Sequence, residues 1–354
     1  MFSFHTFLSA PCFALYRFPD TAVVHAVCAC GAENIQGNFT ELSRQDGFVA
    51  APFDAQKRPI LFIPAERRAR FYAAKLPNIP QVLSGYEEAD RDRYMQDFVA
   101  IKQYLAAEIC TKLVLARRVN LRFQGNSLDI LQAFGAACKA YPHNYVALWH
   151  TPQSGTWLTA TPELLLSRTT DGDCHTMALA GTMPASASEA RRISAWSAKN
   201  LEEQRLVQQH ITHVLDAESL PYRASRLKIV RSGDLLHLRT DFNFATSLSF
   251  NGLLDKLHPT PAVCGMKPHR AKALLAASEQ IERDYYAGYS GPIAPNGAFA
   301  FYVTLRCFYV TEHGCDLFAG GGVLPQSEAE DEWLETERKL DAMRRLMPLS
   351  NRKF

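Results

Sequence analysis

The sequence lacks the cysteine patterns that mark metal-binding and disulfide-stabilised proteins. Nine cysteines are present among 354 residues, but none forms a Cys-x-x-Cys pair. Their number is odd, and Cys28 and Cys30 are too close together for an ordinary bridge. We therefore expect reduced thiols and a cytoplasmic location rather than a disulfide scaffold.

A strong excess of charge and a long apolar run are also missing. The formal net charge is +2, which gives no reason to expect nucleic acid or an acidic membrane surface as a partner. No apolar run is long enough to span a bilayer, and the N-terminal residues 1–16 lack the basic start of a signal peptide. With 47% hydrophobic and 21% charged residues, the composition is that of a globular protein with a large core.

Internal repeats and low-complexity segments are absent as well, so the fold must be read from local patterns. Short strand-like runs, such as residues 22–29 and 60–63, alternate with a few amphipathic helices. Many neighbouring strands are close in sequence, which predicts an α+β fold with large, mainly antiparallel sheets. Residues 1–85 carry no chemical motif and are interpreted as scaffold in the same fold, while residues 90–354 form the unit that carries the motifs.

The most informative segment is residues 317–347, where a strand ending in three glycines precedes a helix. Glu332, Glu335 and Lys339 lie at i, i+3 and i+7, within about 60° of one helix face. Two carboxylates and an ammonium group beside a glycine-rich backbone suit a hard cation next to an anionic ligand. The alternative is a solvated face with ordinary i,i+4 ion pairs.

Two further residues stand at the start of apolar strands. Lys112 begins the run Lys-Leu-Val-Leu-Ala, whose two faces are both apolar, so the lysine begins a buried strand unless its side chain extends to solvent. Glu163 follows Pro162 and precedes Leu164 and Leu165. A half-buried carboxyl group there would have a raised pKa and could donate a proton; the alternative is an exposed glutamate at a strand end.

A helix capped by Ser197 presents a carboxylate on its apolar side. At 100° per residue, the apolar positions of residues 206–214 cluster around the direction of Glu203, while Glu202 points about 100° away. An ionised carboxylate in that position is costly unless it is paired or bound to a metal.

Three other segments add polar groups to the pattern. Small residues Ala180, Gly181 and Thr182 follow a strand and would let a ligand approach the backbone closely. His258 lies in a proline-rich loop, and a helix is expected over residues 271–281. Residues 299–309 are expected to form one strand with Arg306 inside it, where an arginine usually pairs with a carboxylate from the protein or a ligand.

Taken in order, these residues resemble the chorismate-utilising enzymes, and within them the isochorismate synthases. The resemblance covers residues 90–354 and rests on motifs that occur in the family's order and spacing. These are Lys112-Leu-Val-Leu-Ala-Arg, Thr161-Pro-Glu163-Leu, Leu179-Ala-Gly-Thr182, Ser197-x-Lys-x-x-x-Glu203, His237-Leu-x-Thr240, His258-Pro-Thr-Pro-Ala, Arg283-x-x-Tyr286-x-Gly288, Leu305-Arg306, Ala319-Gly-Gly-Gly-Val and Glu332-Trp-x-Glu335-Thr-x-x-Lys339. Asn200 and Gln204 stand where the family usually has Asp and His.

The resemblance implies a layered α/β sandwich of antiparallel sheets flanked by helices, with Mg²⁺ in a central cleft. Glu203 and Glu335 would hold the metal directly, and Glu332 through water. The remaining expected contacts to chorismate come from the backbone around Ala180, Gly181 and Thr182, from His258 facing the ring, and from a group around the enolpyruvyl carboxylate. That group is Arg306, Tyr286, the Gly320 backbone and Lys339.

The implied reaction is the Mg²⁺-dependent isomerisation of chorismate to isochorismate. Lys112 would be the general base for water addition at C2, and Glu163 the general acid for loss of the C4 hydroxyl. Ammonia-using relatives carry Gln at the position of Lys112, so we expect no glutamine amidotransferase subunit, and a monomer by default. The alternatives are a salicylate synthase, which goes on to eliminate pyruvate, and a non-catalytic chorismate-binding subunit. Menaquinone and siderophore biosynthesis both start from isochorismate.

Overall fold

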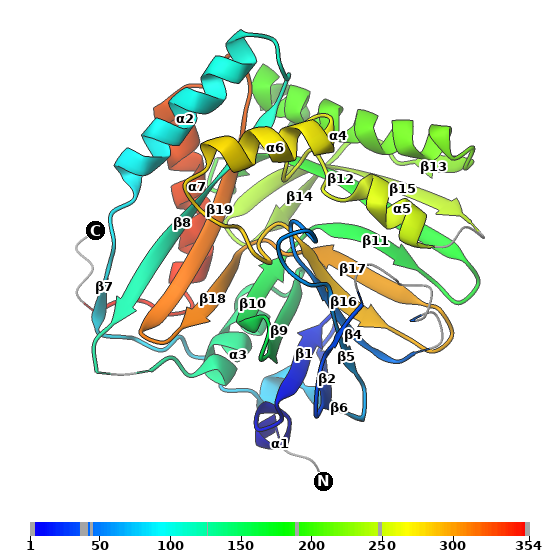
Figure 1. Cartoon of the computed structure of the whole chain (residues 1–354), viewed down its shortest axis with the longest axis vertical. Helices are drawn as coiled ribbons and strands as arrows, with labels where there is room; N and C mark the ends of the chain where they lie inside the picture. The colour runs from blue at the N-terminus through cyan, green and yellow to red at the C-terminus, as the bar shows by residue number, and fades with distance from the viewer. Residues whose placement is uncertain are drawn as a thin grey trace.

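Two large sheets with helices on their outer sides make up the protein (Figure 1). The computed structural model describes residues 4–35, 42, 45–125, 127–187, 191–246 and 250–350. Every pairing between named strands in these ranges is antiparallel. The predicted α+β class with large antiparallel sheets is confirmed.

One sheet has nine strands and contains both N-terminal and C-terminal segments. In spatial order these are β6 (Arg67–Tyr72), β2 (Val23–Ala29), β1 (Cys12–Arg17), β9 (Tyr145–Thr151), β10 (Gly155–Thr161), β18 (Cys307–Thr311), β19 (Gly314–Val323), β8 (Leu113–Phe123) and β7 (Gly85–Glu87). The pairing of β1 with β9 ties residues 12–17 into the sheet that carries the later motifs.

The other sheet has ten strands and likewise mixes early and late segments. Its path runs β13 (Tyr222–Ala224), β15 (Leu235–Ala245), β12 (Asp173–Pro184), β11 (Leu164–Arg168), β17 (Phe299–Val303), β16 (Tyr289–Ile293), β4 (Gly47–Ala51), β5 (Leu61–Pro64) and β3 (Glu33–Asn34), while β14 (Lys228–Ser232) also pairs with β15.

Seven α-helices of the described residues accompany the sheets. They are α1 (Phe4–Leu8), α2 (Arg91–Ala106), α3 (Ile130–Ala140), α4 (Ala198–Ala217), α5 (Phe250–Leu257), α6 (Pro268–Ser278) and α7 (Ala329–Arg344). Two short 3-10 turns, Ala73–Lys75 and Ile193–Ala195, complete the set. No helix among the described residues has the length and apolar character needed to cross a membrane.

The central strands of the nine-stranded sheet are covered on both faces, and this explains the nearly continuous apolar sequences of β1, β9 and β19. Its inner face meets the ten-stranded sheet in a core that includes Trp149, Trp157 and Phe62. On its outer face, Phe134 of α3 and Leu340 of α7 belong to a second apolar cluster. All ten residues of β19 are buried, as expected for a strand that is covered on both sides.

The predicted single strand over residues 299–309 is wrong. The chain leaves the ten-stranded sheet at Val303 and enters the nine-stranded sheet at Cys307. Arg306 lies in the link, with a φ of 45° in the left-handed region. Both strands are apolar and no glycine or proline separates them, so no residue marks the crossing in the sequence. The predicted helix over 271–281 begins earlier, at Pro268, and ends at Ser278.

Candidate active site

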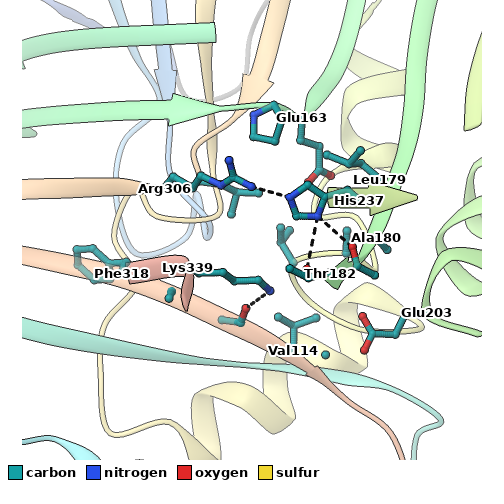
Figure 2. Close-up of a pocket in the computed structure, with 18 of the residues that line it drawn as sticks. Val114, Glu163, Leu179, Ala180, Thr182, Glu203, His237, Arg306, Phe318 and Lys339 are labelled. Carbon is teal, nitrogen blue, oxygen red and sulfur yellow. Dashed lines mark hydrogen bonds between the residues drawn. The ribbon is translucent and has the colours of Figure 1, made fainter. Parts of the chain in front are cut away.

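A cavity lies where the two sheets meet α4 and α7, and it is lined by acidic, basic and apolar side chains. Figure 2 shows side chains from both sheets and from two helices pointing into it. Nine residues singled out from the sequence line the cavity. They are Glu163, Ala180, Gly181, Thr182, Glu203, Tyr286, Arg306, Gly320 and Lys339.

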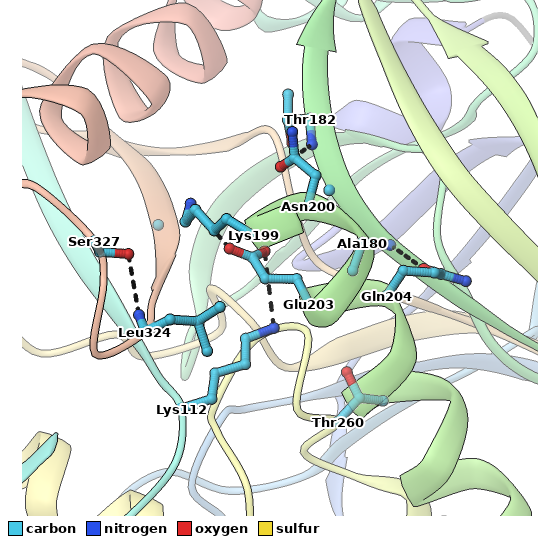
Figure 3. Close-up of polar contacts among 12 residues, drawn as sticks. Lys112, Ala180, Thr182, Lys199, Asn200, Glu203, Gln204, Thr260, Leu324 and Ser327 are labelled. Carbon is cyan, nitrogen blue, oxygen red and sulfur yellow. Dashed lines mark hydrogen bonds and ion pairs between the residues drawn. The ribbon is translucent and has the colours of Figure 1, made fainter. Parts of the chain in front are cut away.

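Lys112 precedes β8 and is 1% exposed, as the apolar pattern of its strand predicted. Its Nζ lies 3.9 Å from Glu203 Oε2, so it stands next to the cavity wall (Figure 3). Burial lowers the pKa of Lys112, and the nearby carboxylate of Glu203 opposes that shift only in part. The amine is thereby moved towards the neutral form that a general base requires.

Glu163 lies between Pro162 and the start of β11 and is 2% exposed. Burial raises the pKa of its carboxyl group to about 8, while the charge of Lys112 opposes the shift. Thr260 Oγ1 lies 3.5 Å from Glu163 Oε1 and can donate to it. At neutral pH this carboxyl group is therefore mainly protonated. The pKa of Lys112 is lowered and that of Glu163 is raised, so the two values are shifted towards each other.

Three glutamates from two helices surround the ammonium group of Lys199. Its Nζ lies 3.0 Å from Glu203 Oε1, 2.8 Å from Glu332 Oε1 and 3.6 Å from Glu335 Oε2. Burial raises the pKa of Glu332. Burial would also raise the pKa of Glu335, but the ammonium groups of Lys339 and Lys199 outweigh it and hold that pKa well below its usual range. The structure thus brings together the carboxylates of two distant helices, as the resemblance to the family implied.

The donor types in this cluster fit a divalent cation. Oxygen ligands from carboxylates are those that Mg²⁺ prefers. Glu203 Oε1 is buried and receives no hydrogen bond within the described residues, although the Lys199 ammonium is close. A Cβ on Gly322 would lie 2.8 Å from the Glu203 carboxylate, so β19 needs glycine there to leave room for it. Among the described residues no three acidic, histidine or cysteine side chains are arranged as a ready metal site, because Lys199 lies between these carboxylates.

Arg306 brings an uncompensated positive charge to the cavity. Its guanidinium group contacts Ser232 and His237, and no carboxylate of the described residues lies within ion-pair distance. Burial lowers the pKa of Arg306 to about 10. Within the described part of the chain, the carboxylate partner expected for this arginine is therefore not a protein side chain.

The C-terminal helix meets the glycine strand at the same cavity. Lys339 Nζ donates to Gly320 O and to Glu335 Oε1, both at 2.8 Å. A Cβ on Gly320 would lie 2.8 Å from the Tyr286 hydroxyl oxygen, so a side chain there would collide with the tyrosine. The expected group of Arg306, Tyr286, Gly320 and Lys339 is thus brought together.

Gly181 and Thr182 form an irregularity in β12, where its register with β15 shifts between Ala180 and Met183. Gly181 has a φ of 71°, which favours glycine. Its carbonyl oxygen lies 3.0 Å from His237 Nδ1. Residues 180–182, which were predicted from their small side chains to let a ligand approach, therefore form a kinked wall of the cavity in β12.

His258 was expected to face the substrate ring from a proline-rich loop. It is absent from the lining of this cavity and lines another one, with its ring edge-on to Tyr289 at 5.0 Å. Thr260, two residues later, is the residue of that loop that points to Glu163. An irregular loop has no periodicity from which side-chain directions can be deduced, and the contact of His258 with the substrate ring stays a prediction.

Thr260 and His237 are site residues to which the sequence analysis gave no role. Both belong to motifs of the family resemblance, so their positions could have been singled out from those motifs. Their contacts to Glu163 and Arg306 join segments more than sixty residues apart and have no local signature.

Comparison with known proteins agrees with this geometry. A sequence profile described as "Chorismate binding enzyme" matches residues 63–348, which is most of the chain. The chain belongs to the chorismate-binding enzyme family. It is 30% identical over 239 residues to the isochorismate synthase MenF of Haemophilus influenzae, covering 65% of this chain and 54% of that protein. It is 28% identical over 317 residues to the isochorismate synthase EntC of Escherichia coli, covering 83% of this chain and 79% of that protein.

Solved structures of family members share the fold. The putative isochorismate synthase DhbC of Bacillus anthracis superposes with a TM-score of 0.80 at 23% identity, covering 95% of this chain and 96% of that one. The menaquinone-specific isochorismate synthase MenF of Escherichia coli gives a TM-score of 0.81 at 20% identity, covering 96% of this chain and 90% of that one. Together these neighbours place the two sheets and the helices in the family's architecture.

The raised pKa of Glu163 predicts a specific pH dependence of stability in the cation-free protein. Below about pH 4.5 the carboxyl group is protonated in both the folded and unfolded states. Between there and its folded pKa of about 8 only the folded state holds the proton, so stability falls as pH rises. The amide of Glu163→Gln does not bind this proton. Relative to that variant, the free energy of unfolding of the wild type should fall by up to about 1.4 kcal/mol per pH unit.

The measurement is urea unfolding of both proteins between pH 5 and 9 with a chelator present. The control is Glu312→Gln, whose side chain is exposed. If the free energies of unfolding of Glu163→Gln and wild type change in parallel across this range, Glu163 is ionised in the folded protein.

Proposed function

We propose that this chain is an isochorismate synthase, which converts chorismate to isochorismate in the presence of Mg²⁺. The observation that carries the proposal is the presence of two buried ionisable groups at one site: Glu163 lines the cavity with a raised pKa, and Lys112, whose pKa is lowered, lies next to Glu203 of the cavity wall. Relatives named isochorismate synthase support it, although the matched segment covers only 54% of the Haemophilus influenzae protein.

In this proposal, neutral Lys112 removes a proton from the water that attacks C2 of the chorismate ring. Protonated Glu163 gives its proton to the C4 hydroxyl group, which leaves as water while the ring double bonds shift. One water is added and one is lost, so the reaction is an isomerisation. General acid and base catalysis of this kind contributes rate factors of about 10²–10⁴ for each group. A lysine rather than a glutamine beside the attacked carbon favours water over ammonia as the nucleophile.

A bound Mg²⁺ would offset the negative charge of a substrate carboxylate in a site that already holds acidic groups. Glu203 and Glu335 would hold it directly, with Glu332 acting through water. Lys199 lies among the same carboxylates, so its ammonium group must move aside or share them when the cation binds.

The second carboxylate of chorismate, on the enolpyruvyl group, would bind to Arg306, with Tyr286, Gly320 and Lys339 around it. The uncompensated charge of Arg306 supports this assignment, because a buried guanidinium group without an anionic partner is costly. The kinked strand at residues 180–182 would form the opposite wall, where backbone can approach the substrate closely.

The direct test is incubation of the purified protein with chorismate and Mg²⁺, followed by NMR identification of the products. Accumulation of isochorismate is expected. Salicylate with an equal amount of pyruvate would instead identify a salicylate synthase, and the absence of any turnover would identify a binding subunit. A parallel reaction with ammonium should give no more than traces of anthranilate, because Lys112 occupies the place of the glutamine in ammonia-using relatives.

Removing the proposed base should separate binding from chemistry. In Lys112→Ala we expect kcat to fall by about 10²–10⁴, because water addition loses its proton acceptor. Chorismate affinity, measured by calorimetry with Mg²⁺, should stay within about threefold of wild type, because the expected substrate contacts are made by other residues. Lys272→Ala, which removes an ammonium group bound to Asp54 outside the cavity, is the control. Turnover near the wild-type value in Lys112→Ala would contradict the assignment.

The acidic cluster can be tested through a pair of neighbouring glutamates on α4. Glu203→Gln should weaken Mg²⁺ binding at least about tenfold and abolish Mg²⁺-dependent turnover, because an amide is a much poorer ligand for a hard cation. Glu202→Gln makes the same change on the next residue, which pairs with Arg205 on the exposed side of the helix. Mg²⁺ affinity is measured by calorimetry, and equal affinities in the two variants would exclude Glu203 as a ligand.

A further inference from the structure

Among the described residues, the guanidinium group of Arg306 is held only by neutral acceptors. Nη1 donates to Ser232 O at 3.1 Å and also contacts the Ser232 hydroxyl oxygen. Nη2 lies 2.5 Å from His237 Nε2, a contact that Figure 2 shows. Arg306, Ser232 and His237 are 6%, 2% and 7% exposed. The guanidinium group is therefore fixed in position, while its charge remains available to a ligand.

The direction of the Ser232 hydroxyl group follows from a chain of hydrogen bonds across the two sheets. Asn144 Nδ2 donates to the carbonyl oxygen of Ala160 at 2.8 Å, which fixes the orientation of the Asn144 amide. Asn144 Oδ1 must then accept from Ser232 Oγ, 2.8 Å away. The hydroxyl hydrogen points to Asn144, so the lone pairs of Ser232 Oγ face Arg306 and can accept from it.

The same reasoning fixes the histidine on the other side of the guanidinium group. His237 Nδ1 lies 3.0 Å from the carbonyl oxygen of Gly181, which can only accept, so Nδ1 carries the hydrogen. Nε2 is then the acceptor for Arg306. Burial, followed by the charge of Arg306, lowers the pKa of His237 to about 3 and keeps the ring neutral. Both neighbours of Arg306 thus present lone pairs without adding a negative charge.

We propose that Ser232, oriented by Asn144, is a positioning residue that aims Arg306 at a carboxylate of the substrate. Ser232 ends β14 in the ten-stranded sheet, and Asn144 precedes β9 in the nine-stranded sheet, so their bond joins the two sheets next to the link that carries Arg306. The backbone of Asn144 is anchored in turn by Arg17 Nη2, which donates to its carbonyl oxygen at 2.9 Å. This inference rests on the proposed function, because it assumes a dianionic substrate in the cavity.

The experiment compares three serine variants in steady-state assays of chorismate conversion at saturating Mg²⁺. In Ser232→Ala, Arg306 loses one acceptor, and KM for chorismate should rise about tenfold. Its kcat should stay within about threefold of wild type, because Lys112 and Glu163 lie on other segments. Ser232→Thr keeps the hydroxyl group and should restore KM to within about twofold of wild type.

Ser154→Ala controls for the loss of a buried serine hydroxyl group. Ser154 is 7% exposed and its hydroxyl bonds Thr151 and Gly155 in the β9–β10 turn, outside the cavity lining. It should lower the melting temperature without changing KM. An unchanged KM in Ser232→Ala, or an equal rise of KM in Ser154→Ala, would overturn the inference while wild-type turnover still upheld the proposed function. A wild type that does not convert chorismate would instead overturn the proposed function.

Discussion

The free-energy cost of burying charged groups between two packed sheets determines the protonation of the proposed catalytic residues. Lys112 and Glu163 are almost fully removed from water, and each is moved by burial towards its neutral form. In water the same two residues would be an ammonium and a carboxylate, neither able to act in the required direction at neutral pH. The reaction proposed for the cavity therefore depends on the sheets excluding solvent from these two groups.

The remaining charges of the site form two separate groups, of which only one is balanced. On the side of α4 and α7, Glu203, Glu332 and Glu335 are offset by Lys199 and Lys339, which makes an acidic cluster stable before any cation is bound. On the opposite side, Arg306 has only neutral neighbours among the described residues. One end of the cavity can thus take a cation and the other an anion, and a small dianion needs both to bind in one orientation.

Much of this site could be predicted from the sequence in helices and strands, where the regular repeat of the backbone determines which way each side chain points. The apolar stripe of α4 placed Glu203 inward, and the face of α7 brought Glu332, Glu335 and Lys339 together, because a helix fixes the angle between successive side chains. The prediction for Lys112 succeeded for the same reason in a strand. The prediction that Arg306 lies inside one strand failed, because the chain crosses there between two apolar strands. For His258, an irregular loop offers no period from which its direction could be deduced. Ser232 was not singled out, since its role rests on contacts with Asn144 and Arg306 across 88 and 74 positions of the chain.

The two positions on α4 that differ from the usual pattern of the family show how the cation side and the strand wall are connected. Gln204 Oε1 accepts from Ala180 N at 2.9 Å and its Nε2 donates to Ala178 O at 3.1 Å, while Asn200 Oδ1 lies 3.4 Å from Thr182 N (Figure 3). An amide can donate and accept at once without a net charge, so it satisfies both backbone groups of the strand. Glu203 lies between these two residues on the helix. The part of α4 that carries Glu203 is therefore attached to the kinked wall at Gly181 by amide side chains, which do not titrate.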